Sequence, residues 1–281
     1  MKIGTCVSLS TMEGLEDKFG QLRKYGFTSC QLISWNPKIW TDENAAVISC
    51  LLDTYGITVS AFWCGWEGPS DWNFYEGQLT LGLVPADYRY ARVMNLCDGA
   101  DFAKKLGETD VVTHMGFNPE NPYDPNYPGI CRAVRTVAEH LKANGQYLLF
   151  ETGQETPVTM LRCFETVDCD NLAINLDTAN LILYGKANPV DALEVFGKYV
   201  RNLHAKDGCW PVNGHDLGME TAIGEGRVDF PAVFRKLFDL GYDSWITIER
   251  EIEGEQQIRD ILSAREYLQS IMVDVYGREA Q

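Results

Sequence analysis

Four residues that can bind metals or transfer protons stand at the ends of apolar runs in the second half of the chain. They are Glu151 in LLFETG, Asp177 in AINLDTAN, His204 in VRNLHAKDG and Glu249 in WITIERE. A buried carboxylate needs a cation, a proton or hydrogen-bond donors beside it, because unpaired charge is costly to remove from water. If the four converge, they predict a divalent cation between them. Oxygen ligands with one nitrogen suit Mn²⁺, Mg²⁺ or Co²⁺ better than a structural zinc site, which favours thiolates.

A repeated pattern of amphipathic stretch, glycine and short apolar run marks the elements that position these residues. It occurs at Gly26, Gly56, Gly107, Gly145 and Gly241. Glycine tolerates the left-handed conformation that ends a helix, so each pattern predicts a helix end followed by a strand. With three runs that lack the glycine, the predicted strands are Lys2–Val7, Ser29–Ile33, Thr58–Trp63, Asp110–His114, Gln146–Glu151, Leu172–Asp177, Tyr199–His204 and Trp245–Glu249. The helical patterns between them include Gly14–Lys24, Asn44–Tyr55, Tyr88–Leu106, Ile130–Ala143 and Gln256–Ile271.

This alternation predicts an α/β fold, namely a single-domain (β/α)₈ TIM barrel over residues 1–281. The length of the chain agrees with the usual size of about 250 residues for such a barrel. A doubly wound open sheet is the alternative. It would more often carry a glycine-rich phosphate turn after the first strand, where this chain has SLSTM at residues 8–12.

In a barrel the reacting groups gather at the carboxyl ends of the strands, which is where the four candidate ligands stand. Side chains alternate across a strand, so Asn175, Asn202 and Thr247 are expected to share the interior face with them. The alternative is that each polar strand end is satisfied separately by its own neighbouring loop. Four successive strands that end in this way favour the metal site.

The composition excludes several kinds of partner. Forty acidic and twenty-four basic residues give a net charge of −16, which repels nucleic acid and anionic lipid surfaces. No stretch approaches the roughly 20 apolar residues that span a bilayer. The nine cysteines are scattered, odd in number and without a CxxC pair, which is typical of reduced thiols. We therefore expect a soluble, cytoplasmic protein that binds neither nucleic acid nor membrane.

The motifs F-E-T at Glu151, N-L-D at Asp177, H-A-K-D at His204 and I-E-R-E at Glu249, with G-E-G at residues 224–226, resemble those of a known family. The chain resembles the xylose isomerase-like TIM-barrel superfamily over nearly its whole length, in particular the sugar phosphate isomerase/epimerase group. The resemblance implies one divalent metal held by these four residues, with Mn²⁺ the expected ion and Mg²⁺, Co²⁺ or Zn²⁺ possible. It also implies that Glu151 and Glu249 act as catalytic bases on opposite faces of a substrate carbon, through a metal-stabilised enediolate.

Two positions depart from the pattern of the ketose 3-epimerases in this superfamily. Those enzymes carry a histidine three residues after the ligand aspartate and an arginine six residues after the ligand histidine. This chain has Asn180 and Trp210 there, which makes a plain fructose or tagatose 3-epimerase less expected. The related endonuclease IV enzymes use several extra histidines to hold three zinc ions, whereas this chain has four histidines in all.

Further residues are predicted to contact the substrate. His114 ends a strand and can donate to a substrate hydroxyl or act as an acid, although a structural role is an equal alternative. Lys206, two residues after the ligand histidine, is expected to return to the interior side and contact a sugar oxygen, with a solvated loop position as an equal alternative. For Asp207 the solvated position is slightly favoured. Trp35 and Trp66 belong to a cluster of early aromatic residues that suits a sugar ring. The long segment at residues 65–86 predicts a lid or a contact in a homo-oligomer.

The sequence thus predicts an isomerase or epimerase that acts on a small sugar or polyol-derived substrate by removing a proton next to a carbonyl. The sparse arginines near the site favour an unphosphorylated substrate. A lyase or dehydratase acting on an inosose or a 3-keto-glycoside is the alternative from another reaction class, with His114 or Lys206 as the acid at the leaving group. A sugar-binding module without catalysis is the third hypothesis.

Overall fold

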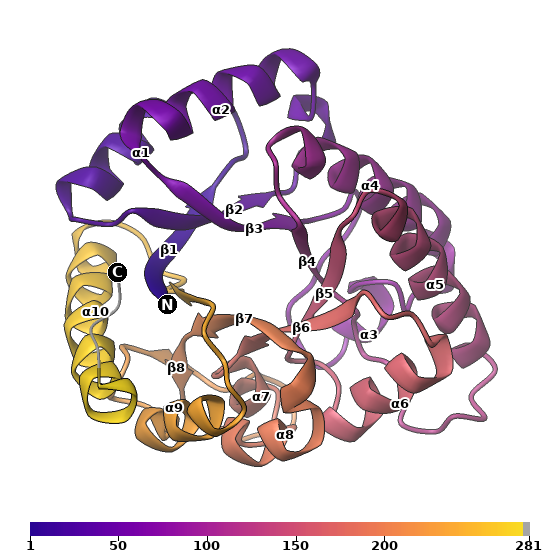
Figure 1. Ribbon diagram of the computed structural model, residues 1–281. Coiled ribbons are helices and arrows are strands. Elements are labelled where there is room, and N and C mark those ends of the chain that lie inside the picture. Colours follow the sequence, from indigo (N-terminus) through magenta and orange to yellow (C-terminus); the bar gives the residue numbers. More distant parts are fainter. Residues whose placement is uncertain (278–281) are drawn as a thin grey trace.

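The computed structural model describes residues 1–277 and has eight parallel strands in a closed barrel, in the order β1-β10-β7-β6-β5-β4-β3-β2. Figure 1 shows the strands enclosed by an outer layer of helices. The barrel strands are β1 (Lys2–Ser8), β2 (Ser29–Ser34), β3 (Thr58–Cys64), β4 (Asp110–His114), β5 (Tyr147–Glu151), β6 (Leu172–Asp177), β7 (Val200–Ala205) and β10 (Trp245–Ile248). The predicted (β/α)₈ TIM barrel with a single domain is confirmed, while the last four residues of the predicted 1–281 domain lie outside the described part.

The outer layer follows the strands in sequence. Its helices are α1 (Leu15–Lys24), α2 (Asp42–Tyr55), α4 (Ala86–Lys105), α5 (Tyr127–Ala143), α6 (Pro157–Val167), α8 (Pro189–Phe196), α9 (Phe230–Asp239) and α10 (Glu255–Tyr276). Shorter pieces at the loops are α3 (Gly77–Thr80), α7 (Asn180–Leu183), the 3₁₀ turns Pro37–Ile39 and Gly197–Tyr199, and the small hairpin of β8 (Asp207–Gly208) with β9 (Glu220–Thr221). None of the helices within residues 1–277 combines the length and the apolar character needed to cross a bilayer.

Local signals explain where the helices end. All five glycines predicted at helix ends have positive φ values, between 58° and 81°. At the start of α2, the Thr41 hydroxyl accepts a hydrogen bond from the amide of Asn44 at 3.2 Å. Asp229 caps α9 in the same way through the amide of Ala232 at 3.0 Å. The alternation of helix and strand is therefore encoded locally, residue by residue.

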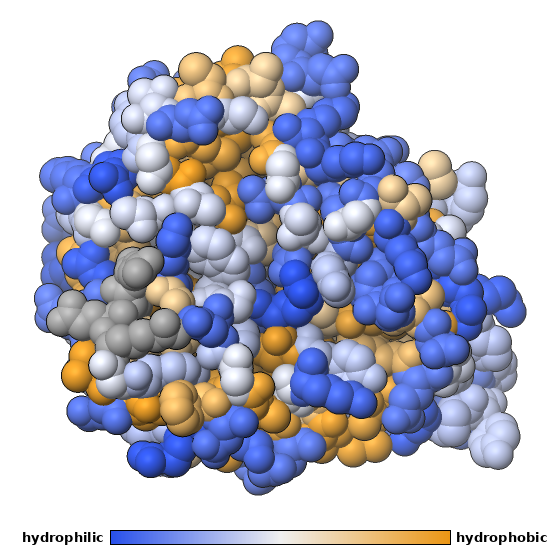
Figure 2. All heavy atoms as spheres, viewed as in Figure 1, coloured by the Kyte–Doolittle hydropathy of each residue, from blue (hydrophilic) through white to orange (hydrophobic). Residues whose placement is uncertain are grey.

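The apolar core has two parts that match the two faces of the strands. Residues facing the helices form the larger cluster, and a smaller cluster inside the barrel includes Ala61, Val112, Leu149 and Ala173. Burying a side chain of valine or leucine size stabilises the fold by about 1.5–3 kcal/mol. Hydrophilic residues cover most of the face shown in Figure 2, with hydrophobic residues in the recesses between them. The nine cysteines are free thiols.

Polar residues at the carboxyl ends of the strands lie inside the barrel, as the alternation predicts. The amide of Asn202 on β7 donates to the carbonyl of Ser60 on β3 at 3.1 Å, and the Ser60 hydroxyl lies 3.4 Å from that of Thr247 on β10. These strands are not neighbours in the barrel, so the contacts cross its interior. The β6–β7 register also pairs Asp177 with His204. The barrel closure thus brings residues from distant parts of the chain to one end, hereafter the mouth.

Candidate metal centre

Four side chains from four strand ends converge at the mouth. Glu151, Asp177, His204 and Glu249 each offer one ligand atom, and these atoms all lie within 4.8 Å of one another. The Nδ1 atom of His204 lies 3.2 Å from Glu249 Oε2, 3.5 Å from Glu151 Oε1 and 3.8 Å from Asp177 Oδ2. The first three residues are buried, and Glu249 is nearly so. The structure therefore brings together the four ligands that the sequence predicts.

The imidazole of His204 is held by a glutamine on the opposite side of its ring. Its Nε2 atom lies 2.7 Å from Gln31 Oε1 on β2. A neutral ring that donates its Nε2 proton to Gln31 directs the lone pair of Nδ1 toward the three carboxylates. Burial alone would lower the pKa of His204, but the carboxylates of Glu151 and Glu249 raise it well above its usual value. The three carboxylates thus favour positive charge at this position.

Asp177 has one oxygen bound by the chain and one left over. Its Oδ1 accepts hydrogen bonds from the amides of Ala179 at 2.9 Å and Asn180 at 2.7 Å. Its Oδ2 atom is buried and has no hydrogen-bond partner within residues 1–277, and burial raises the pKa of this carboxyl well above its usual value. A buried acceptor of this kind is costly unless a cation or a proton satisfies it. The orphaned oxygen therefore fits a divalent cation at the centre.

Glu151 is oriented by donors from two other elements. Its Oε2 accepts a hydrogen bond from the indole of Trp63, and its Oε1 accepts one from the side-chain amide (Nδ2) of Asn180 at 3.2 Å. His114 Nε2 lies 3.7 Å from Oε1. Burial alone would raise the pKa of Glu151, but His204 and His114 lower it. The glutamate is thus held ionised and in a fixed orientation.

Lys206 places a buried ammonium group beside the centre. Its Nζ lies 2.8 Å from Glu251 Oε2, 3.3 Å from Glu249 Oε2 and 3.4 Å from Asn180 Oδ1. Burial alone would raise the pKa of Glu249, but Lys206 and His204 lower it well below its usual value. Glu249, the residue directly after β10, is therefore ionised as well. The sequence-based prediction that Lys206 returns to the interior agrees with this position.

A cavity of about 380 Å³ opens directly onto the centre. Trp35, Trp63 and Trp72 line it on the side of β2 and β3, and Leu183 and Tyr184 line it at α7. The ring centroids of Trp35 and Trp63 lie 4.9 Å apart. His114, Glu151 and Glu249 also border this space. The cavity has the size of a small-molecule site in which aromatic faces meet a few polar groups.

Trp66 lies behind this wall rather than in it. The centroid of its ring lies 4.9 Å from that of Trp35. The guanidinium of Arg92, a residue of α4, lies 4.9 Å from the same Trp66 ring. Arg92 is fully buried and donates to the carbonyls of Gly82 at 2.7 Å and Pro69 at 2.8 Å. Arg92 therefore fixes the segment at residues 65–86, and Trp66 supports Trp35 from behind.

Asp207 is occupied by backbone groups of the following loop. Its carboxylate accepts hydrogen bonds from the amides of Gly208, Gly224, Gly226 and Val228 at 2.8–3.1 Å. A β-carbon on Gly226 would collide with this carboxylate, which explains the second glycine of G-E-G. These bonds give Asp207 a role in holding the loop, and a substrate contact for it stays an unsupported prediction.

Sequence reasoning missed several residues of the site. Gln31, Trp72 and Glu251 were not singled out as site residues, and Asn180 was noted only as a departure from the epimerase pattern. Gln31 carried a usable signal, because it is a polar residue inside the apolar strand SCQLIS. Glu251 stands beyond the end of β10, where alternation no longer predicts direction.

A family model described as "Xylose isomerase-like TIM barrel" matches residues 19–271. The chain belongs to this xylose isomerase-like family. A crystal structure of a xylose isomerase domain protein from Planctomyces limnophilus is 34% identical, with a TM-score of 0.91, and the match covers 98% of this chain and 99% of that one. The structure of a D-tagatose 3-epimerase-like protein is 21% identical, with a TM-score of 0.75 and coverage of 99% of both chains, and it supports the fold alone.

The curated relatives of this xylose isomerase-like chain include dehydratases. An inosose dehydratase from Geobacillus thermodenitrificans is 27% identical over 90% of this chain and 88% of its own length. Matches to the inosose dehydratases of Lacticaseibacillus casei span about half the length of those proteins. Relatives of this chain by sequence therefore include inosose dehydratases, and its fold is shared with an epimerase-like protein.

Proposed function

We propose that this protein is a divalent-metal-dependent sugar isomerase or epimerase that removes a proton next to a carbonyl. The observation that carries the proposal is the approach of two ionised glutamates, Glu151 and Glu249, from separated strands. β5 and β10 are divided by β6 and β7 in the barrel. Two carboxylates that reach one small volume from different directions suit removal of a proton on one face of a carbon and its return on the other.

The donor set of the centre favours a hard divalent cation. Three carboxylates, among them that of Asp177 with its orphaned Oδ2 atom, and one imidazole suit such an ion. Mn²⁺ is our choice, with Mg²⁺, Co²⁺ and Zn²⁺ as alternatives. When bound, the ion supplies positive charge that stabilises the negative charge developing on the substrate oxygens. Gln31 orients His204, and Trp63 and Asn180 orient Glu151. These contacts keep the ligand histidine and the base Glu151 in place before the substrate binds.

The substrate that the cavity suits is small, neutral and partly apolar. Trp35, Trp63 and Trp72 offer faces on which the C–H face of a sugar can stack. The nearest cation, Lys206, is already paired with Glu249 and Glu251, so a phosphate or carboxylate group has no free positive partner among the lining residues within 1–277. An unphosphorylated sugar or polyol derivative is therefore our proposed substrate class.

A lyase reaction is the second candidate, because the same proton abstraction can be followed by loss of a β-substituent. Two groups stand near the bases and can protonate a leaving group. His114 lies 3.7 Å from Glu151, and Lys206 lies 3.3 Å from Glu249. Similarity to an inosose dehydratase over 90% of the chain supports the lyase reaction as the second candidate.

Isotope exchange tests the proposal. The Mn²⁺-loaded protein is incubated in D₂O with ketoses, inososes and 3-keto-glycosides, and deuterium incorporation and products are followed by NMR. We expect exchange at one carbon next to a carbonyl, with the product separating epimerase from lyase. Glu151→Gln and Glu249→Gln should each reduce exchange by at least about 100-fold. Glu225→Gln, an exposed carboxylate in the G-E-G loop, is the matched control and should leave exchange unchanged.

Metal content measured on the same samples separates loss of the base from loss of the ion. Wild-type exchange rates in both glutamine variants would refute the proposed base roles. Tight sugar binding with no exchange of substrate hydrogen would instead favour the sugar-binding module.

A further inference from the structure

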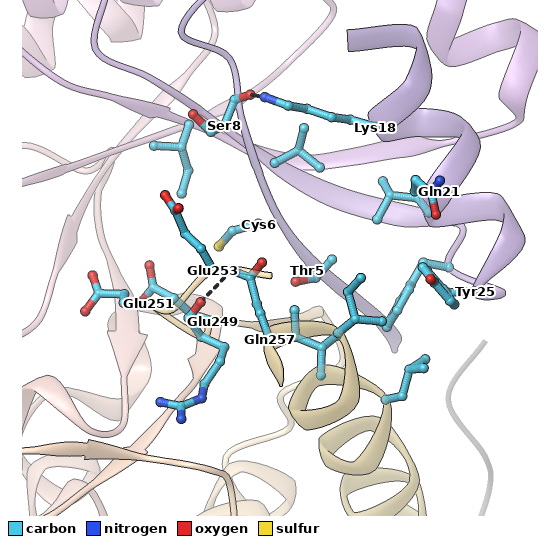
Figure 3. Close-up of a pocket in the computed structure, with 18 of the residues that line it drawn as sticks. Thr5, Cys6, Ser8, Lys18, Gln21, Tyr25, Glu249, Glu251, Glu253 and Gln257 are labelled. Carbon is cyan, nitrogen blue, oxygen red and sulfur yellow. Dashed lines mark hydrogen bonds between the residues drawn. The ribbon is translucent and has the colours of Figure 1, made fainter. Parts of the chain in front are cut away.

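A second cavity of about 680 Å³ adjoins the metal centre between α1 and α10. Ile33, Glu249 and Glu251 line both this cavity and the substrate cavity, so the two spaces share a wall at the metal ligand. Figure 3 shows Glu249 and Glu251 at one end of the cavity, and Gln21 of α1 and Tyr25 directly after this helix at the other. The space therefore leads away from the centre toward the outer layer of the barrel.

The cavity lies where the first and last helices of the outer layer face each other (Figure 1). α1 packs against α2, and α10 packs against α9, while the space between α1 and α10 is hollow. Half-buried apolar side chains line it from both sides, namely Tyr25 directly after α1 and Ile258, Ile261 and Leu262 on α10. Phe27 and Leu22 form buried parts of the lining. The walls thus leave apolar surface in contact with water in the absence of an occupant.

The charged groups at the rim disfavour an anionic occupant. Asp17, Glu249, Glu251 and Glu253 contribute carboxylates to the lining. The two cations of the lining are already engaged by neighbouring groups. Lys18 donates to the carbonyl of Ser8 at 2.6 Å, and Arg250 pairs with Glu220 at 3.2 Å and Asp260 at 2.8 Å. An uncharged apolar group is the occupant that both the walls and the rim accept.

We propose that this cavity is a second compartment of the active site, which holds the apolar substituent of a neutral glycoside whose sugar ring lies at the metal centre. The inference rests on the proposed function for the sugar end of the ligand. The shared lining carries it, because a ring bound beside Glu249 lies next to residues that also line the cavity. The protein then selects substrates by their aglycone as well as by their sugar.

Calorimetric titration of the Mn²⁺-loaded full-length protein tests this compartment with two probes, methyl and hexyl β-D-glucopyranoside. Five additional methylenes in an apolar cavity should tighten binding of the hexyl glycoside by at least about tenfold. Ile258→Trp fills the cavity from α10 and should reduce this preference to less than about twofold. Val273→Trp adds the same side chain at a position of α10 that is 46% exposed and outside the cavity, and it should keep the preference.

Equal affinities for the two probes, or no binding of the hexyl glycoside, would overturn the inference. A preference that persists in Ile258→Trp would also overturn it, because the alkyl chain would then lie elsewhere. If Ile258→Trp changes the sedimentation coefficient and the wild type shows no preference, a second copy of the chain occupies the cavity. Isotope exchange without a chain-length preference counts against this inference alone, and a preference without exchange counts against the proposed chemistry alone.

Discussion

Glu155, four residues after the candidate ligand Glu151, carries a buried carboxyl group whose protonation should contribute to the pH dependence of stability. Its side chain is 2% exposed, and neither oxygen has a hydrogen-bond partner within residues 1–277. Burial raises its pKa from 4.5 to about 8. The group is therefore protonated in the folded protein at neutral pH and ionised in the unfolded chain.

The sign and the size of the effect follow from this difference. Below pH 4.5 both states hold the proton, so the group costs no stability. As the pH rises to about 8, the unfolded chain loses the proton first, and the free energy of unfolding falls by about 1.4 kcal/mol per pH unit. Over the whole interval the loss is on the order of 5 kcal/mol, and it stays constant above the folded pKa.

Glu155→Gln removes the titrating group and keeps the shape of the side chain. Urea unfolding of both proteins across this pH range should show that the variant gains stability relative to the wild type as the pH rises. Glu165→Gln, at an exposed position of α6, is the matched control and should leave the pH profile unchanged. A difference between Glu155→Gln and wild type that is the same at every pH would refute the reasoning.

Two further predictions concern residues that hold others in place. Gln31→Leu removes the acceptor at Nε2 of His204 and should weaken Mn²⁺ binding by about 10–100-fold without unfolding the barrel, as measured by calorimetry and circular dichroism. Unchanged affinity would show that the ring needs no such support. Arg92→Met leaves the carbonyls of Pro69 and Gly82 without their donor and should reduce the free energy of unfolding by about 1–3 kcal/mol per carbonyl, with faster proteolysis at residues 65–86. Protease resistance equal to wild type would contradict the role of Arg92 in fixing this segment.

The strands could be predicted because their ends carry local signals. Asp110–His114 and Leu172–Asp177 match the predicted bounds, since each is an apolar run that stops at a polar residue. The other strands differ by one residue at one or both ends, where hydrogen bonding to the neighbouring strand decides the boundary. For example, β10 ends at Ile248, although the amide of Glu249 still donates to the carbonyl of Ala205 at 3.0 Å.

The site could be predicted only where a side chain belongs to a strand. Alternation gives the direction of Glu151, Asp177 and His204, but it gives no information on residues in loops. Trp66 and Asp207 illustrate this limit. A tryptophan that supports another ring and an aspartate that binds loop amides have the same residue types as substrate contacts, and only the tertiary structure separates them.

The candidate metal ligands and the tryptophans of the cavity come from different halves of the barrel. The four acidic and imidazole groups come from β5, β6, β7 and the end of β10, whereas the tryptophan wall comes from β2, β3 and the segment that follows β3. The proposed reacting groups and the tryptophans of the cavity therefore come from separate stretches of the chain. If the proposed function holds, substitutions confined to residues 65–86 should change which small molecule the cavity accepts while the proposed reacting groups stay in place, so new specificities can arise without an inactive intermediate.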